Sequence, residues 1–554
     1  MTTRRRGAAV LVLGIIVLAG IATAARATPG EDALTAGGVS CAVDDHAAVH
    51  AISPYIYGVA GADPSTLEGL GATLNRWGGN PSSRFNWVIG HAWNAASDWE
   101  FRNVDYGGNG GSASDATIAA NRAAHVDTLL TIPALGWVAR SANPEDRSVG
   151  VPAEGAGTVD AAVAYDPTAN REGTSVPSRP RKPGPFVLDP DPASRIVYQD
   201  EWVNHLVAHF GRAGAGGVRL YAVDNEPMLW SVTHRDVHPA PVGYDELART
   251  FEQYSSAIKA VDPTALVAGP ESWGYTDLLY SALDRGTDNY ATHADRSAHG
   301  DVPLTPWFLR TIHDRDVASG RRSLDVLTVH YYPQGRGAGD ASDPEASAQR
   351  LRSTRSLWDP AYVDESWIND TVRLIPRLRE WVAEDYPGTR IGITEYNFGG
   401  GDSVSAGLAE AEALGVLGRE NVFLATYWTA PKPGSPAWFA FRMYRDADGH
   451  GTGFGDTSVA ATSSAPDTVS CFASRERGWT DVMLMNKDLQ RGHALTLRLA
   501  RGAGAGAVQR LQYSGADPRS IVRRADIGSG TSGSGLSADL PSGSITLLRV
   551  PAHG

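Results

Sequence analysis

The sequence predicts an α/β fold, a (β/α)8 TIM-like barrel with a smaller C-terminal β-sandwich domain. Between about residues 53 and 436, short apolar runs alternate with stretches of helical apolar spacing. From about residue 437 the helical spacing gives way to alternation of apolar and polar residues, broken by Gly/Ser-rich turns such as 528–535. A chain of 554 residues is also too long for one hydrophobic core.

Eight apolar runs are the predicted barrel strands, and each is bounded by Gly, Pro or Asn. They are residues 55–60, 73–77, 129–135, 218–223, 266–269, 324–330, 391–395 and 422–428. Helical spacing at 202–207, 247–261 and 374–382 precedes the fourth, fifth and seventh runs. Eight alternating units of this kind predict a closed barrel. A long excursion at 141–192, rich in Pro, Gly and Asp, is predicted to border the cleft.

The predicted sandwich consists of residues 38–52 together with 437–554. It contains both cysteines of the chain, Cys41 and Cys471. If the N-terminal segment joins the sandwich as an added strand, the two thiols come close enough for a disulfide. Two unpaired buried thiols are the alternative. Two cysteines do not suffice for a multi-thiolate metal site.

The N-terminus is typical of an export signal. Arg4, Arg5 and Arg6 precede an apolar stretch that runs to about residue 25, and Ala25-Arg26-Ala27 supplies a small-x-small cleavage site. We therefore expect a signal peptide at 1–27 and a secreted, extracellular, monomeric protein with no membrane attachment after cleavage. An uncleaved membrane anchor is the alternative, because the apolar stretch is long.

The net charge of -13 argues against nucleic acid as a partner. Three motif classes are absent from the sequence: the His-Glu-x-x-His of zinc proteases, the Gly-x-Ser-x-Gly of serine esterases and a Gly-rich phosphate loop after the first strand. These absences leave a neutral ligand such as a polysaccharide compatible with the chain.

Two predicted strands end in a glutamate. Glu226 follows the fourth strand in an Asp-Asn-Glu-Pro segment, and Glu395 ends the seventh in Thr-Glu-Tyr-Asn. Reactive groups of such barrels lie at the carboxyl ends of the strands. Glycoside hydrolysis requires two carboxylates, one to protonate the leaving oxygen and one to attack or stabilise the anomeric carbon. Ion-paired barrel residues are the structural alternative, and the two roles are interchangeable on this reasoning.

Several segments together resemble glycoside hydrolase family 44, a family of secreted endo-β-1,4-glucanases and xyloglucanases. They include NRWGGN at 75–80, DNEP at 224–227, HYYP at 330–333 and TEYN at 394–397, with shorter matches at 53–58, 84–87, 97–99, 233–234, 238–239, 324–326, 357–360, 418–420 and 427–428. The resemblance covers the whole barrel. It implies a retaining mechanism with Glu226 as acid/base and Glu395 as nucleophile, and no required cofactor. Some members contain a structural calcium ion, but no calcium ligands can be assigned in this sequence.

Further side chains are predicted to bind a β-glucan polysaccharide. Asn225 is placed to bind the sugar 2-hydroxyl, and Arg76 and Asn80 to brace the nucleophile and bind hydroxyls. Tryptophan faces stack on pyranose rings, and among the fifteen tryptophans we select those in loops after strands. The remaining predicted contacts are Trp137, His330, Tyr332, Trp358, Trp367 and Trp428. Core packing is the alternative for each of these residues.

Two other functions remain open at this stage. A non-catalytic glycan-binding protein would use the same scaffold, but the presence of both carboxylates disfavours it. A hydrolase whose main substrate is xylan or mannan would differ only in the loops of the cleft. Release of reducing ends from carboxymethylcellulose distinguishes the binder from the hydrolase.

Overall fold

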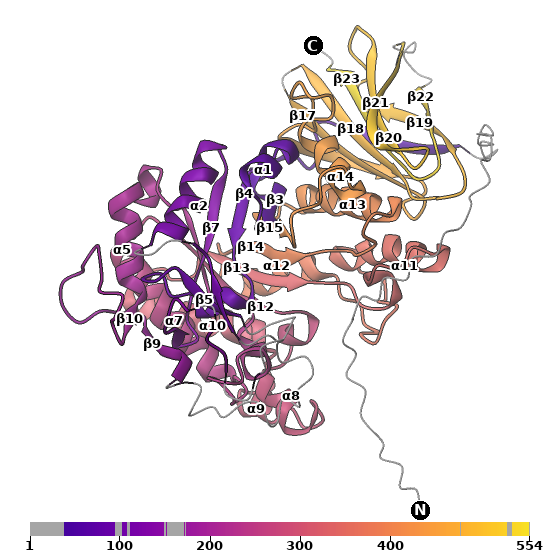
Figure 1. Cartoon of the computed structure of the whole chain (residues 1–554). Helices are drawn as coiled ribbons and strands as arrows, with labels where there is room; N and C mark the ends of the chain where they lie inside the picture. The colour runs from indigo at the N-terminus through magenta and orange to yellow at the C-terminus, as the bar shows by residue number, and fades with distance from the viewer. Residues whose placement is uncertain are drawn as a thin grey trace, which may run out of the picture.

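A computed structural model gives the architecture of the chain (Figure 1). It describes residues 38–94, 102–107, 111–143, 145–148, 151, 171, 173–476, 478–528 and 535–552. The predicted signal peptide at 1–27 and the family-like segment at 97–99 lie outside these ranges. Within them, no helix combines the length and the apolar character needed to cross a membrane.

Eight parallel strands close into a barrel, and each of them falls in or overlaps one of the predicted apolar runs, which confirms the predicted fold class. The ring follows the order of the chain. Its strands are β3 (Gly58–Ala60), β4 (Leu74–Trp77), β7 (Asp127–Ile132), β11 (Leu220–Val223), β12 (Leu266–Ser272), β13 (Val326–Tyr331), β14 (Arg390–Tyr396) and β15 (Leu424–Tyr427).

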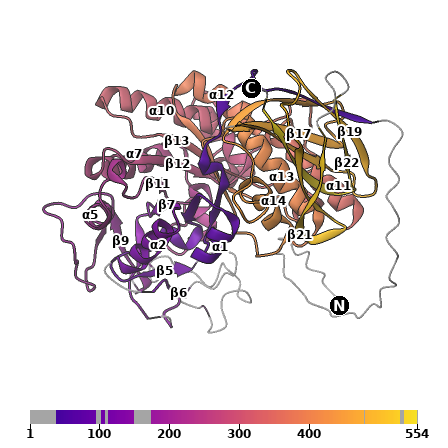
Figure 2. The same cartoon turned by 90° about the horizontal axis from the view of Figure 1, so that it is seen from above.

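Helices surround the barrel (Figures 1 and 2). The three predicted helical stretches correspond to α5 (Gln199–Phe210), α7 (Tyr244–Val261) and α12 (Leu374–Asp385). The other helices are α1 (Pro64–Leu70), α2 (Ser112–Ala123), α6 (Trp230–Thr233), α8 (Ala282–Asp288), α9 (Ala294–Ala298), α10 (Leu304–Ser319), α11 (Pro344–Ser353), α13 (Val404–Arg419) and α14 (Pro436–Arg445).

A buried apolar layer closes one end of the barrel and sets the orientation of the residues beyond it. Leu74, Val326 and Leu424 belong to one cluster of fully buried side chains contributed by different strands. Alternate residues of a strand point to the same side. Arg76 lies two residues after Leu74 on β4, and His330 lies four residues after Val326 on β13. Both therefore point to the same side as the apolar layer, but at the carboxyl ends of their strands. The inward-facing side chains are thus apolar at the closed end of the barrel and polar at its mouth.

The second, all-β unit contains both the C-terminal strands and the first described segment. Its connected order is β21-β20-β23-β18-β17-β16-β1-β19-β22, and β2 pairs with β16. The strands are β1 (Val39–Asp44), β2 (His50–Ala51), β16 (Thr457–Ser463), β17 (Val469–Glu476), β18 (Trp479–Asn486), β19 (His493–Leu499), β20 (Val508–Ser514), β21 (Asp517–Ile527), β22 (Leu536–Leu540) and β23 (Ser544–Pro551). This confirms the β-sandwich of the predicted fold class, with its own hydrophobic core.

The N-terminal segment joins the sandwich as an internal strand. β1 pairs antiparallel with β16 and parallel with β19. Cys41 on β1 and Cys471 on β17 form a disulfide, with 6.2 Å between their Cα atoms. Both cysteines are buried in the sandwich core.

Helix α14 changes the expected start of the all-β region. The alternation of apolar and polar residues predicts an all-β region from about residue 437. Residues 436–445 are instead helical, and the first C-terminal strand begins at Thr457. Ser435 caps the helix by accepting from the Trp438 N–H, and Pro436 occupies the first turn. Most of its apolar side chains are buried, so α14 is the helix that follows the eighth barrel strand.

Helix α13 lies between the barrel and the sandwich, and both views show it there beside α14 (Figures 1 and 2). Its residues from Ser405 to Gly418 are all buried. A Cβ atom on Gly415 would lie 2.5 Å from a ring carbon of Phe472 on β17, so this close approach requires glycine. Glu412 on the same helix faces Lys487 of the sandwich, with 3.6 Å between Oε1 and Nζ.

Two smaller sheets flank the barrel. β5 (His91–Asn94) pairs with β6 (Arg102–Asp105), and β8 (Trp137–Ala139), β9 (Ser175–Arg179) and β10 (Val197–Tyr198) form a three-stranded sheet. β9 belongs to the predicted excursion at 141–192, most of whose central part lies outside the described residues.

Candidate active site

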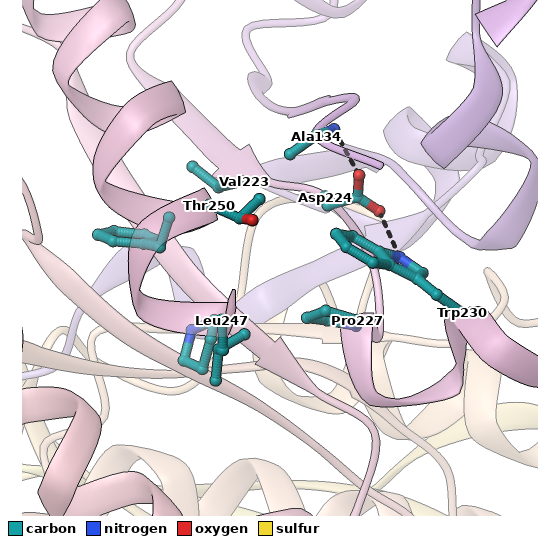
Figure 3. Close-up of a pocket in the computed structure, with 9 residues that line it drawn as sticks. Ala134, Val223, Asp224, Pro227, Trp230, Leu247 and Thr250 are labelled. Carbon is teal, nitrogen blue, oxygen red and sulfur yellow. Dashed lines mark hydrogen bonds between the residues drawn. The ribbon is translucent and has the colours of Figure 1, made fainter. Parts of the chain in front are cut away.

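The segment after β11 is anchored by the carboxylate of Asp224 (Figure 3). The carboxylate accepts from the backbone N–H groups of Ala134 and Leu135, from the Ser83 hydroxyl and, at 3.2 Å, from Trp230 Nε1. Burial raises the pKa of Asp224 to about 6, against the lowering effect of these donors. The fixed carboxylate determines where the next two residues point.

The backbone turns sharply at this anchor. Asp224 and Glu226 adopt left-handed φ angles of 61° and 45°, which are uncommon for residues other than glycine. The Glu226 N–H donates to the carbonyl of Glu271 at 3.1 Å. Behind the turn, Val223, Pro227 and Leu247 line a small apolar cavity (Figure 3). The side chain of Glu226 is only 12% exposed at the mouth of the barrel.

Glu395 on β14 is held by two donors. Arg76 Nη1 donates to Oε1 at 2.7 Å, and the Tyr332 hydroxyl donates to Oε2 at 2.8 Å. Arg76 is completely buried and braces the carboxylate. Burial raises the pKa of Tyr332 well above its usual range, and the charge of Glu395 adds to this effect. Tyr332 therefore remains a hydrogen-bond donor at any physiological pH.

His330 links the two glutamates. Its Nδ1 lies 2.8 Å from Oε1 of Glu226 and 3.5 Å from Oε2 of Glu395. Burial lowers the pKa of the imidazole, but the charge of Glu395 and the hydrogen bonds to Glu226 and Glu271 outweigh it and raise the pKa to about 9. The ring is therefore a cation at neutral pH.

One carboxylate oxygen from each of Glu226 and Glu395 and a ring nitrogen of His330 all lie within 4.8 Å of one another. Carboxyl groups about 5–5.5 Å apart are typical of retaining glycosidases, whereas inverting enzymes need about 6.5–9.5 Å to fit a water molecule. The spacing of the oxygens is compatible with the shorter range. Two glutamates on non-adjacent strands thus converge across the barrel mouth.

The pKa of Glu226 is raised, and burial is the largest cause because it penalises the charged form. The charge of Glu395 raises it further, while His330 and Arg76 lower it. A carboxyl group with a raised pKa is suited to donate a proton.

Asn225 and Asn80 extend the network at the barrel mouth. Asn225 Oδ1 accepts from Arg76 Nη2 at 2.8 Å, and its Nδ2 donates to Asn80 Oδ1 at 3.0 Å. An amide nitrogen carries two hydrogens, so one donor of Asn225 remains for a ligand.

Glu271 is a third carboxylate at this site, and the sequence analysis missed it. Its Oε2 accepts from Arg76 Nη2 at 3.1 Å and from His330 Nε2 at 3.3 Å. Burial alone would raise its pKa, but His330 and Arg76 lower it to about 2. The predicted fifth strand ended at residue 269, whereas β12 continues to Ser272. A glutamate two residues beyond a predicted strand end was the available signal.

Two hollows are each lined by a side chain that contacts Glu395. One, of about 310 Å³, is lined by Arg76, Tyr106 and the half-buried Trp428, whose ring lies 5.7 Å from Arg76 Cζ. The other is lined by Tyr332 and by Trp367, which is 61% exposed and donates from Nε1 to Gln334 at 3.2 Å. Both hollows contain a residue that holds Glu395.

Two other predicted tryptophans lie elsewhere. The Trp358 ring is covered by Arg419 at 4.3 Å, and the same guanidinium lies 5.5 Å from Phe472 of the sandwich. Trp358 therefore packs at the junction of barrel and sandwich, and its role in sugar binding stays a prediction. Trp137 on β8 lies under Arg171 at 5.7 Å, and none of the contacts among the described residues joins it to the glutamates.

The described residues do not assign a calcium site. Two groups of three potential metal ligands occur among them, Asp115 with His205 and His209, and Glu226 with His330 and Glu395. Both include histidine, whereas calcium takes oxygen ligands.

Comparison with known proteins identifies the family. The model of glycoside hydrolase family 44 matches residues 92–335. Endoglucanase A of Paenibacillus lautus is 32% identical over 484 residues, which cover 81% of this chain and 64% of the relative. This chain thus spans less than two thirds of that relative.

Two solved structures match nearly end to end. CelM2, a bifunctional glucanase-xylanase from a metagenome library, is 37% identical with a TM-score of 0.83 and is covered over 93% of this chain and 99% of its own. A Paenibacillus polymyxa xyloglucanase from family 44, solved with xyloglucan, is 28% identical with a TM-score of 0.81 and the same coverage. The chain belongs to glycoside hydrolase family 44.

Proposed function

We propose that the chain is a secreted, retaining, endo-acting glycoside hydrolase that cleaves β-1,4-linked glucans. The observation that carries the proposal is the convergence of Glu226 and Glu395, with oxygens within 4.8 Å, at the mouth of the barrel. Each is held by its own donors, Glu226 by His330 and Glu395 by Arg76 and Tyr332. This division supports Glu226 as the proton donor and Glu395 as the nucleophile.

The first step forms a glycosyl-enzyme. Glu395 attacks the anomeric carbon while Glu226 donates its proton to the glycosidic oxygen, and the C–O bond to the leaving sugar breaks. In the second step the Glu226 carboxylate takes a proton from a water molecule. The resulting oxygen attacks the same carbon and releases Glu395. Two inversions give net retention of the anomeric configuration.

The two hollows support attack within a chain. Trp428 in one hollow and Trp367 in the other offer aromatic faces to sugars on both sides of the cleaved bond. The similarity to an endoglucanase and to a xyloglucanase makes glucan and xyloglucan the first substrates to test. The glucanase-xylanase CelM2 makes xylan the second candidate.

The test is a panel of carboxymethylcellulose, xyloglucan, mixed-linkage glucan, xylan and mannan. We expect reducing ends from a β-1,4-glucan, with viscosity falling early as mid-chain cleavage requires. Proton NMR should show the β-anomer as the first product. An α-anomer formed first would contradict the retaining mechanism. Binding without release of reducing ends from any substrate would identify a glycan-binding protein instead.

We also propose export with cleavage after Ala27, based on the signal-like N-terminus. Mass spectrometry of protein secreted by an expression host should give a mature N-terminus at Thr28. Retention of the intact N-terminus in the membrane fraction would favour the anchor.

A further inference from the structure

Glu271 occupies the centre of the site without reaching its surface. It lies at the end of β12 and is completely buried. A single oxygen, Oε2, accepts from Arg76 Nη2 and from His330 Nε2. Because no part of its side chain is exposed, Glu271 can act on a substrate only through its partners.

Those partners are the groups that hold the two catalytic glutamates. Arg76 donates through its other terminal nitrogen to Glu395, and His330 contacts Glu226 through its other ring nitrogen. Arg76 is therefore shared between Glu271 and Glu395, and His330 between Glu271 and Glu226, with Oε2 of Glu395 also 3.5 Å from Nδ1 of His330. The Glu271 carbonyl also accepts the Glu226 N–H, at a residue with a left-handed φ of 59°. Backbone and side chain of Glu271 thus fix the acid/base from two directions.

The charges around His330 come from every strand that faces it. β4 supplies Arg76, the turn after β11 supplies Glu226, β12 supplies Glu271 and β14 supplies Glu395. Burial raises the pKa of Tyr332 and the pKa of Asp277 well above their ordinary values, which favours the neutral form of each. When Glu226 is protonated, two cations balance two carboxylates.

We propose that Glu271 is a positioning residue whose negative charge keeps His330 protonated beside Glu226 throughout the catalytic cycle. The inference rests on the proposed function and adds a third carboxylate to it. After Glu226 gives up its proton, the cationic His330 stabilises the carboxylate that results. Without the charge of Glu271, the imidazole loses an anionic partner and deprotonates at a lower pH. Proton donation by Glu226 then becomes less favourable.

The variant Glu271→Gln removes this charge and keeps the shape of the side chain. We expect a deficit in kcat that grows with pH, from less than about threefold at pH 5 to about tenfold or more at pH 8. KM should change less than about twofold, because Glu271 does not touch the substrate. The alkaline limb of the kcat profile should move about one unit or more to lower pH.

Glu412→Gln is the matched control, since Glu412 is also buried and paired with a cation but lies on α13 at the junction with the sandwich. It should change thermal stability and leave the shape of the pH profile unchanged. A Glu271→Gln profile that equals the wild-type profile multiplied by one constant factor would overturn the inference, because a merely structural role predicts that result.

A measurement on the wild-type protein covers the case in which Glu271→Gln does not fold. NMR titration of labelled histidines, with His330 assigned through His330→Asn, should give a pKa near 9 in the wild type. Titration of His330 below about 7 would overturn the inference. Absence of hydrolysis by the wild type would refute the proposed function alone, because the titration would still report on the charges around His330.

Discussion

At the scale of single residues, the acid/base is defined by its neighbours. Glu226 lies in a left-handed turn, is almost buried and receives a hydrogen bond from a cationic histidine. In the proposed mechanism, these conditions hold the proton on Glu226 until the leaving group departs and stabilise the carboxylate afterwards.

The variant Glu226→Ala tests this assignment. It should lower the rate on polysaccharide by about 10²–10⁴-fold, because the leaving sugar then departs unprotonated. Aryl glycosides with good leaving groups should be affected less at the first step, and azide should restore turnover by replacing the base-assisted water. Glu395→Gln should be inactive on both kinds of substrate. Undiminished polysaccharide hydrolysis by Glu226→Ala would show that another group is the acid.

Variants of two tryptophans distinguish a role in substrate binding from a role in packing. Trp367 is exposed in a hollow beside Tyr332, whereas the ring of Trp358 lies under Arg419. Trp367→Ala should raise KM for polysaccharide about two- to tenfold and leave the melting temperature unchanged. Trp358→Ala should leave KM unchanged and lower the free energy of unfolding by roughly 1–3 kcal/mol. A raised KM with an unchanged free energy of unfolding for Trp358→Ala would instead indicate that Trp358 contacts the substrate.

Single residues were predictable where a strand pattern fixed their direction. Glu226 and Glu395 were found because each ends an apolar run, and the barrel places such ends together. Glu271 was not found, because Pro270 interrupts the apolar run two residues before the strand ends. The packing of Trp358 on Arg419 was not predicted, because the two residues are distant in sequence and a single sequence does not show which surfaces meet.

At the scale of elements, α13 contains a buried carboxyl group whose contribution to the free energy of unfolding depends on pH. Glu410 is 1% exposed and accepts a hydrogen bond from the Tyr396 hydroxyl at 2.8 Å. Tyr396 directly follows Glu395 in the chain. Burial raises its pKa from 4.5 to about 8, against the lowering effect of Tyr396. Since the folded form binds the proton more tightly than the unfolded form, its contribution to stability is complete below pH 4.5 and is lost by about pH 8.

The variant Glu410→Gln removes this dependence, because a neutral amide oxygen still accepts from Tyr396. We expect the wild-type free energy of unfolding to fall more steeply between pH 5 and 8 than that of the variant, by on the order of a few kcal/mol. Denaturant titrations at several pH values measure the difference. Parallel curves for the two proteins would mean that Glu410 is already ionised in the fold.

Elements were predicted where period and length agreed. Eight strands and the helices α5, α7 and α12 follow apolar spacing of sufficient length. Helix α14 has ten residues and is shorter than the three helices that were predicted. Its end caps, Ser435 with Pro436, were the clearer signal.

At the scale of the whole molecule, one covalent bond joins two segments that are 430 residues apart. The double variant Cys41→Ser/Cys471→Ser removes a loop constraint on the unfolded chain. We expect its free energy of unfolding to fall by roughly 2–4 kcal/mol with little change in kcat, since both sulfurs lie in the sandwich core. Equal denaturation midpoints for variant and wild type, with the wild-type disulfide verified by mass spectrometry, would contradict this.

The association of barrel and sandwich was predictable in outline only. Residues 38–52 were expected to add strands to the sandwich, but a single sequence does not order the strands of a sheet. The parallel pairing of β1 with β19 depends on contacts across most of the chain. The same applies to α13, whose burial on all sides follows from lying between two units.

The position of β1 has a consequence for synthesis of the chain from its N-terminus. β1 leaves the ribosome first among the described strands, yet both of its neighbours, β16 and β19, come after the entire barrel. At ordinary translation rates, this leaves its two edges without partners for several tens of seconds. The barrel can close in that interval. The sandwich sheet that contains β1 forms only after its C-terminal strands have been synthesised. A nascent chain halted before Thr457 would therefore present an open β-strand to other chains.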